Sequence, residues 1–174
     1  MENSRKGWIE NGVGYIPLTN GKTAKVDPEL VEKLSDYIWT AVWNPHTKSF
    51  IAHRSEKKNG IWSTTKMHRF IKGVTDYHTK VDHENHDTLD NRMSNLRICS
   101  NKENLYNSRL SSANTSGHKG VSFCKLKGRW RAYINFDGKR VALGYHDSKE
   151  VAIQIRKEAA KTLHGEFVYE GEAA

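Results

Sequence analysis

Residues 129–145 read RWRAYINFDGKRVALGY, and this stretch decides the fold of the C-terminal part of the chain. Trp130, Ala132 and Ile134 alternate with polar side chains, as in a strand that buries one face. Asp137-Gly138 is a favoured two-residue hairpin turn, so the chain after it should return as a second strand beside the first. The stretch therefore predicts an antiparallel hairpin with one apolar and one polar face.

The flanking sequence completes a small domain around this hairpin. A further strand is predicted at 120–124, before a turn at Lys127-Gly128. A helix is predicted to begin at an Asp147 or Ser148 cap and to end at Gly165. Its apolar positions at three- and four-residue spacing are Val151, Ala152, Ile155, Ala159 and Leu163. We expect a three-stranded antiparallel sheet with the helix on its apolar face.

The other face of that sheet should stay uncovered and polar. It would present Arg129, Arg131, Tyr133 and Asn135. A β-ribbon can enter the major groove of DNA, where Arg reads guanine and Asn reads adenine. We favour nucleic-acid binding over a merely solvated polar face because the arginines line up with a tyrosine.

Composition supports a nucleic-acid partner and excludes other classes. The chain has 174 residues, 28 Lys plus Arg against 20 Asp plus Glu, and a net charge of +8, which favours a polyanion. It has no apolar run of roughly 18–20 residues for a membrane span and no secretory signal, so we expect a cytoplasmic protein without membrane partners. Its 2 cysteines, Cys99 and Cys124, lack the pairing of a disulfide framework or a cysteine zinc site.

The positive charge is concentrated near the C-terminus. Residues 1–67 carry a net +3, residues 68–113 a net +1 and residues 114–174 a net +4. The stretch 119–140 holds seven basic side chains and one acid, which suits a phosphate-facing surface. The middle segment instead concentrates Asp, His and Asn.

The N-terminal stretch is predicted to be rich in strands, with one helix. A hairpin should turn at Asn20-Gly21, and Asp27-Pro28 should cap and begin a helix. The apolar stripe of that helix would be Leu30, Val31, Leu34, Tyr37 and Ile38. Short strands are expected at 39–43, 49–53 and 61–65, and Trp8, Trp39, Trp43 and Trp62 are expected in the core.

The middle segment holds the side chains for phosphodiester chemistry. Asp82 and His83 are adjacent, so on a strand they point to opposite sides. A neutral His suits the role of base towards water, and a carboxylate with an amide oxygen suits Mg²⁺. Asn95 would orient the histidine ring, and Asn104, in a helix that starts near residue 100 or 101, would reach the ion from the other side.

This pattern resembles the HNH nucleases, especially the phage homing endonucleases. The resemblance covers about residues 67–109 and rests on Asp82-His83, Asn95 and Asn104, on the preceding Met67-His68-Arg69-Phe70-Ile71, and on Asp90-Asn91-Arg92 and Asn95-Leu96-Arg97. It implies a β-hairpin followed by a helix, wrapped around one metal ion, and cleavage that leaves a 5′-phosphate.

The same resemblance implies the roles of the site residues. His83 would be the general base, Asp82 and Asn104 the metal ligands, and Asn95 a brace for the loop and for His83. Asn104 stands where the family name has its last His, which favours Mg²⁺ or Mn²⁺ over a softer metal. Asn107 is an additional or alternative ligand, whereas His86 is interpreted as a loop residue and Arg97 as a DNA contact.

The C-terminal stretch, 114–168, resembles a second family, the plant APETALA-type (ethylene-response-factor) DNA-binding domain. The match rests on Asn114-Thr115-Ser116-Gly117, on 119–122, 128–132 and 143–145, and on the helix at 150–152. It implies that the sheet lies in the major groove and that the matching positions contact DNA: Lys119, Ser122, Cys124, Lys127, Arg129, Arg131, Tyr133, Asn135 and Arg140. Ser122, Cys124 and Ala142 depart from the plant pattern, so the mode of binding transfers and the sequence that is read does not.

We therefore predict an α+β chain with three parts. Residues 1–66 form a β-rich region with one helix, 67–113 an HNH module of the ββα-metal type, and 114–174 a DNA-binding domain. The predicted function is a site-directed, homing-type DNA endonuclease with one Mg²⁺ or Mn²⁺ per site and no small-molecule cofactor. It would act on double-stranded DNA as a monomer, in the host cell of a phage. The alternatives are an inactive DNA-binding regulator and, with less support, an RNA-acting nuclease.

Overall fold

The computed structural model describes residues 6–45, 47–108, 110–111 and 113–168. It is a mixed α+β structure made of small antiparallel sheets and short helices, which confirms the predicted fold class. The chain divides into two compact units, which we call the N-terminal unit (residues 1–100) and the C-terminal unit (residues 101–174). The predicted three-part division stays a prediction. No helix within the described ranges is long and apolar enough to cross a membrane.

The first sheet of the N-terminal unit contains β1 (Trp8–Glu10), β2 (Val13–Pro17) and β3 (Thr23–Val26), all antiparallel. Strands β2 and β3 form the hairpin predicted around Asn20-Gly21, and Gly21 has the positive φ of 69° that this turn requires.

The predicted first helix is shorter than its apolar spacing indicated. It consists of a 3₁₀ turn, η1 (Pro28–Leu30), and α1 (Val31–Ser35), and Ile38 beyond it is 58 % exposed. Asp27 lies at the expected cap position but makes no side-chain cap bond. Its carboxylate instead accepts a 2.7 Å hydrogen bond from the backbone N–H of Met93, which is 66 residues further along the chain.

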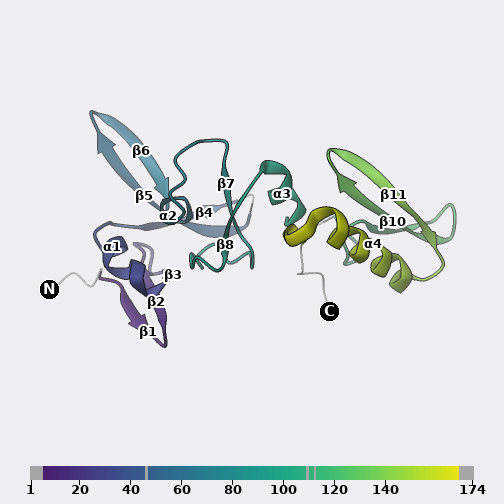
Figure 1. Cartoon of the computed structure of the whole chain (residues 1–174), viewed down its shortest axis with the longest axis horizontal. Helices are drawn as coiled ribbons and strands as arrows, with labels where there is room; N and C mark the ends of the chain where they lie inside the picture. The colour runs from purple at the N-terminus through teal and green to yellow at the C-terminus, as the bar shows by residue number, and fades with distance from the viewer. Residues whose placement is uncertain (1–5, 46, 109, 112, 169–174) are drawn as a thin grey trace. The chain divides into compact units, whose positions relative to one another are not determined.

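The second sheet contains β4 (Thr40–Asn44), β5 (Ser49–Lys58) and β6 (Ile61–Lys66), and α2 (Met67–Ile71) follows directly. One core joins both sheets and the helices, and its largest buried side chain is Trp39. Figure 1 shows that the far end of the β5–β6 hairpin extends beyond this core.

The expectation that four tryptophans lie in the core was wrong for three of them. Trp39 is 1 % exposed, but Trp8, Trp43 and Trp62 are 44 %, 51 % and 67 % exposed. Trp8 stacks on Tyr15 at the surface, with ring centroids 5.4 Å apart. Aromatic side chains fill a small core only up to its volume, and Trp39 with its aromatic neighbours already occupies this one.

The last strands of the N-terminal unit form the hairpin that carries the candidate site. β7 (Lys80–His83) pairs antiparallel with β8 (Leu96–Cys99), so that Asp82 lies opposite Arg97 and His83 opposite Leu96. The connecting loop, residues 84–95, contains Asn95 of the predicted site, together with Asp90 and Asn91.

The C-terminal unit begins with α3 (Asn101–Tyr106). Its sheet has the order β11-β10-β9, with β9 (Val121–Cys124), β10 (Arg129–Phe136) and β11 (Lys139–His146) all antiparallel, as predicted. Helix α4 (Lys149–His164) runs along one face of this sheet (Figure 1) and ends in a 3₁₀ turn, η2 (Gly165–Phe167). Ser148 is the cap, since its hydroxyl accepts hydrogen bonds from the N–H groups of Glu150 and Val151.

The buried face of α4 differs in part from the predicted stripe. The fully buried positions are Ala152, Arg156, Ala160 and His164, whereas Val151 is 47 % exposed. The ring of His164 stacks on Tyr106 with centroids 3.8 Å apart, and its Nε2 lies 3.0 Å from the carbonyl oxygen of Asn135. His164 therefore takes a core position because aromatic stacking and hydrogen bonding accommodate it.

Candidate active site

His83 lies at the end of β7 and is 6 % exposed. Its Nε2 is 3.3 Å from the amide oxygen of Asn91, a side chain that is itself fully buried. The ring of His68, from α2, packs edge-on against the ring of His83 with centroids 4.9 Å apart. Two neighbouring side chains thus fix the plane and the position of the imidazole.

The contact with Asn91 also determines which nitrogen of His83 carries the hydrogen. The Nδ2 of Asn91 donates to the carbonyl oxygen of Leu89 at 3.2 Å, so the Oδ1 of the same amide faces the ring of His83. An amide oxygen only accepts, so Nε2 of His83 must donate. The lone pair of the neutral ring is therefore on Nδ1, where it is available to accept a proton.

Burial favours the neutral form of both histidines. It lowers the pKa of His83, against the opposing effects of the hydrogen bond to Asn91 and of the nearby carboxylates. For His68, burial and the neighbouring positive groups lower the pKa to about 3. The Nδ1 of His68 is buried and has no hydrogen-bond partner among the described residues. At neutral pH the pair is uncharged, and an uncharged His83 is the form that acts as a base.

Asn95 braces the loop that holds this arrangement. It is 7 % exposed; its Nδ2 donates to the carbonyl oxygen of Asp90 at 2.7 Å, and its Oδ1 accepts from the N–H of Asn85 at 2.9 Å. The amide in contact with the imidazole is that of Asn91, next to the residue that Asn95 holds. Asn95 thus acts on His83 through the loop.

The carboxylate of Asp90 closes the same loop from the inside. The side chain is 1 % exposed and accepts from Arg92 at 2.8 and 2.6 Å and from Asn85 at 3.1 Å. Burial raises its pKa, but the hydrogen bonds and charge of Arg92, with the bond from Asn85, outweigh burial and hold the pKa of Asp90 below its usual value. The loop therefore has a charged and fully bonded centre.

The first sheets of the N-terminal unit hold the outside of this loop. The backbone of Lys25, in β3, bonds to Leu89 at 2.8 Å and to Asn91 at 2.7 Å. The hydroxyl of Thr88 donates to the carbonyl oxygen of Phe50, in β5, at 2.6 Å. The region before residue 67 therefore positions the residue that orients His83.

Asp82, the predicted metal ligand, faces a different partner. Its Oδ2 accepts from Nη2 and Nε of Arg97 at 3.2 and 3.4 Å, and both side chains are 13 % exposed. Arg97, predicted as a DNA contact, thus lies against the carboxylate, and its Nη1 is 4.0 Å from Glu84. The pair fixes the direction in which the carboxylate points.

The remaining predicted ligands belong to the C-terminal unit. Asn104 is exposed on α3, and Asn107, just after that helix, is 2 % exposed. His86, interpreted as a loop residue, lies in the β7–β8 loop with a φ of 61°. No group of three or more His, Cys, Asp or Glu side chains within the described ranges is arranged to hold a metal ion.

Sequence reasoning missed two residues of the site, His68 and Asn91. Both stood in stretches that carried the HNH resemblance, but neither had been given a role. Asn91 was one of several asparagines in the segment 85–107, and only the fold shows which of them meets His83.

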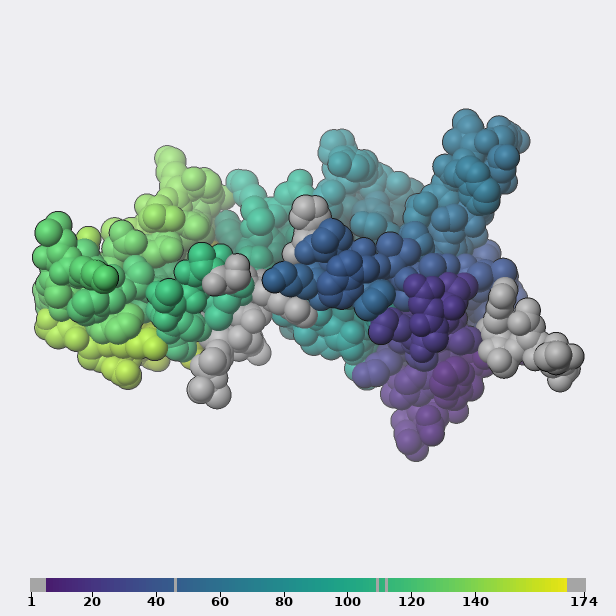
Figure 2. Space-filling view, turned by 180° about the vertical axis from the view of Figure 1, so that it is seen from behind, coloured from purple at the N-terminus to yellow at the C-terminus, as the bar shows by residue number. Residues whose placement is uncertain are grey.

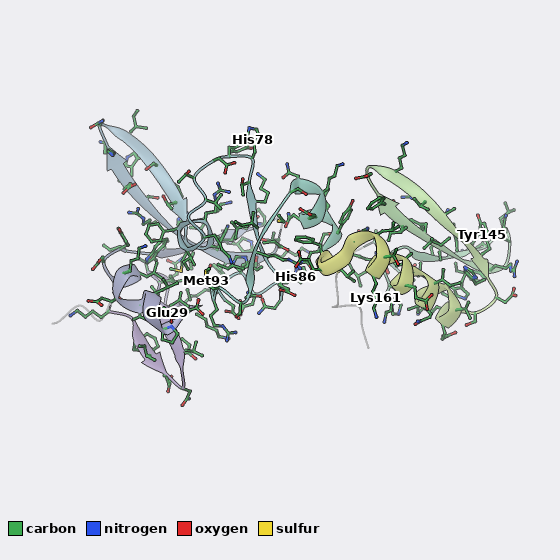
Figure 3. All side chains as sticks on the ribbon, viewed as in Figure 1. Glu29, His78, His86, Met93, Tyr145 and Lys161 are labelled. Atoms are coloured by element: carbon green, nitrogen blue, oxygen red, sulfur yellow. The ribbon has the colours of Figure 1, made fainter. Side chains whose placement is uncertain are left out.

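The C-terminal sheet has the predicted polar face, opposite α4. Cross-strand pairs place Arg131 opposite Ser122 and Asn135 opposite Arg140, and Tyr133 lies between them on β10. The guanidinium of Arg140 lies over the ring of Tyr133 at 4.3 Å. Figure 3 labels Tyr145, on β11 of this sheet, and Lys161, on α4. The polar sheet face thus contains an aromatic ring flanked by cations.

The other predicted DNA contacts occupy varied surroundings. Arg129 forms a two-point ion pair with Asp147 at 2.7 and 2.9 Å, and Lys127 lies over the ring of Tyr145 at 4.1 Å. Lys119 donates to the carbonyl oxygen of Tyr106 and to the hydroxyl of Ser108, at 3.0 and 3.2 Å.

Comparisons with known proteins match the segment that contains His83. A family model described as HNH endonuclease matches residues 77–106, which include Asp82, His83, Asn91, Asn95 and Asn104. "Protein 3.8" of Escherichia phage T7 is 34 % identical over 87 residues, which cover 50 % of this chain and 71 % of that protein. No solved structure matches. The chain therefore belongs to the family of phage T7 Protein 3.8 and carries an HNH endonuclease segment around His83.

Proposed function

We propose that this nuclease is a metal-dependent DNA endonuclease of homing type, with His83 as the general base. One observation carries the proposal. The buried His83 is neutral, its Nε2–H is held by Asn91, and the lone pair on Nδ1 is left for a proton. This tautomer, orientation and charge state are what a base towards water needs.

The roles of the protein groups follow from this geometry. As a water oxygen attacks the phosphorus of the scissile phosphodiester, Nδ1 of His83 accepts the proton of that water. The bond from phosphorus to the 3′ oxygen breaks, which gives a 5′-phosphate and a 3′-hydroxyl after protonation. Asn91 stabilises the imidazolium through its oxygen, and Asn95 keeps the loop in place.

The donor chemistry of this segment fits a hard divalent cation. Asp82 offers a carboxylate and Asn104 an amide oxygen, the ligand types that Mg²⁺ and Mn²⁺ prefer. We propose that these two residues hold one such ion and that Arg97 keeps Asp82 oriented. A divalent ion bound there would stabilise the charge that develops on the phosphate and on the leaving oxygen. Asn107 is a further candidate ligand.

We propose that the polar sheet face of the C-terminal unit, of the APETALA type, holds the target DNA. The face is not covered by α4, and it combines Arg131, Tyr133, Asn135 and Arg140 with Ser122. A ribbon of this kind can enter the major groove, where Arg and Asn make two-point contacts with guanine and adenine. We also propose that the enzyme acts as a monomer, and the phage origin of the relative supports the cytoplasm of an infected host as the place where it acts.

Metal-dependent plasmid cleavage tests the proposed activity. The full chain should convert supercoiled plasmid to nicked or linear DNA with Mg²⁺ or Mn²⁺ and should stop when EDTA is added. Asp82→Asn removes the charged ligand and should slow cleavage by at least about 100-fold. Cleavage that continues unchanged in EDTA would refute the metal dependence, and a chain that binds DNA but never cleaves would instead be a regulator.

A salt titration tests the sheet. A cation of the bound surface that displaces one counterion from the DNA, at a phosphate or within the groove, contributes about 0.9 to the slope of log K against log salt. Arg131→Ala should therefore flatten the slope, whereas Lys157→Ala, an exposed position on α4, should leave it unchanged. Equal slopes for both variants would show that the DNA does not lie on the polar sheet face.

A further inference from the structure

The outer half of the β5–β6 hairpin has no assigned role and is exposed on both faces. From Ser55 to Lys58 and from Ile61 to Thr64 every residue is exposed. Figure 2 shows this hairpin, coloured blue to teal, standing out from the N-terminal unit, and Figure 1 shows the same from the other side. A pair of strands exposed on both faces is only marginally stable by itself, so the question is what it contacts.

The strand register sorts its side chains into two faces. Residues directly opposite each other in an antiparallel ladder point to the same side. One side, which we call the lysine face, contains His53, Ser55, Lys57, Trp62, Thr64 and Lys66. The other side, which we call the acidic face because it holds Glu56, the one acid of these two strand segments, contains Arg54, Glu56, Lys58, Ile61, Ser63 and Thr65.

The acidic face is the side that turns towards the core. At its base the guanidinium of Arg54 lies over the ring of Tyr37 at 4.1 Å and also pairs with Glu56 at 3.0 Å. The lysine face carries no acid. Lys57 lies at its outer end directly opposite Trp62, which is 67 % exposed, and Lys66 lies at its inner end. It thus combines positive charge, hydroxyl groups and one large aromatic ring on one open surface.

We infer that the lysine face of the β5–β6 hairpin is a second DNA-binding surface, separate from the sheet of the C-terminal unit. This inference rests on the proposed function. Lysines attract phosphates, hydroxyl side chains donate to phosphate oxygens, and a two-stranded ribbon fits the major groove. Trp62 supplies the apolar contact to sugars or bases, which explains why so large a ring is left exposed.

The charge complementarity selects duplex DNA over an apolar protein partner. A protein groove built for Trp62 would also have to neutralise or desolvate the adjacent Lys57, whereas a DNA backbone pairs with this lysine directly. The same unit carries the candidate base His83, so the hairpin would hold the duplex near the segment that cuts it.

The test uses the full chain with His83→Ala, which prevents cleavage, and a labelled duplex of arbitrary sequence of about 30 base pairs. Fluorescence anisotropy gives the dissociation constant over a range of KCl concentrations. Lys57→Ala should weaken binding about fivefold at about 0.15 M salt and reduce the salt slope by about 0.9. Trp62→Ala should weaken binding about tenfold, the loss typical of a truncated aromatic anchor.

Two neighbours on the acidic face are matched controls. Lys58 and Ile61 lie one residue nearer the turn, are equally exposed and have the same residue types to truncate, a lysine and a large apolar side chain. Lys58→Ala and Ile61→Ala should each change the dissociation constant by less than about twofold. Circular dichroism of each variant shows that the sheets are retained.

The outcomes separate the two proposals. If the variants of both faces behave alike, or if Lys57→Ala and Trp62→Ala bind the duplex as the parent does, the hairpin is not a DNA surface, although the nuclease proposal stands. Tighter binding of a single-stranded RNA of equal length, with loss in the same variants, would overturn duplex DNA as its partner. A parent chain that binds no duplex overturns the proposed function as well.

Discussion

Replacement of His68 by Phe should make the stability of the N-terminal unit less dependent on pH. Burial and nearby positive groups lower the pKa of His68 to about 3, whereas an unfolded His titrates near 6.5. Between these values the unfolded chain binds a proton that the folded chain does not. The contribution of His68 to stability is therefore complete above about pH 6.5 and is lost as the pH falls towards 3. Phe keeps a ring against His83 but cannot titrate.

The size of the effect follows from the two pKa values. Each pH unit below about 6.5 costs about 1.4 kcal/mol of unfolding free energy from this group alone. Between about pH 7.5 and pH 5.0 the native chain should thus lose about 2 kcal/mol more than His68→Phe does. The lowered pKa of His83 acts in the same direction, but it is present in both proteins. The difference between the two pH profiles isolates His68.

Urea unfolding followed by tryptophan fluorescence measures this difference. The chain has 5 tryptophans, of which only Trp130 lies in the C-terminal unit. A Trp130→Phe background therefore makes the signal report on the N-terminal unit. At pH 7.5 the His68→Phe variant is expected to be less stable than the native chain, since the core must accept a different ring. The test therefore compares how the free energy of unfolding of each protein changes with pH. Parallel pH profiles for the two proteins would refute a neutral, buried His68.

Two other positions give predictions about folding and catalysis. Gly120→Ala should destabilise the C-terminal unit by at least about 3 kcal/mol in thermal unfolding. The reason is that Gly120 has a φ of +66° and that the new Cβ would lie 2.0 Å from the carbonyl oxygen of Tyr133. Unchanged stability would mean that this close approach does not exist. Asn91→Ala should lower kcat about 10- to 100-fold with little change in KM, because Nε2 of His83 loses the amide oxygen that accepts its hydrogen bond. A variant that raises KM and leaves kcat unchanged would instead place Asn91 in DNA binding.

Local signals predicted the parts of the fold that short-range chemistry decides. The turns at Asn20-Gly21 and Asp137-Gly138, the alternation along β10 and the Ser148 cap of α4 all depend on residues within a few positions of each other. The antiparallel sheets of both units follow from them. Such patterns are visible in a sequence because strand and helix periods act locally.

Long-range packing decided what the sequence could not show. Asp27 was predicted to cap a helix, but its carboxylate accepts a hydrogen bond from the backbone N–H of Met93. The predicted apolar stripe of α4 does not include His164, yet this side chain is buried because Tyr106 stacks on it. Trp62 was expected in the core, but it lies in the outer half of the β5–β6 hairpin, which is exposed on both faces. In each case the partner lies far along the chain, or the available core volume is already filled.

The candidate site shows the same division. The adjacency of Asp82 and His83 and the position of a strand beneath them could be predicted. The orienting amide could not, because Asn91 and Asn95 lie four residues apart in one loop and both are buried. The backbone bonds from Lys25 to Leu89 and Asn91, together with the brace from Asn95, place the amide of Asn91 against the ring.

The rate of plasmid cleavage by His83→Ala, in Mg²⁺ and at equal concentration of folded protein, shows whether His83 is the general base. His86→Asn is the matched control, because it changes a histidine of the same loop at a positive φ of 61° that Asn tolerates. Loss of the general base should lower the rate by about 100- to 10,000-fold, while His86→Asn should cleave as the native chain does. Equal cleavage by His83→Ala and the native chain would contradict the assignment of His83 as the base.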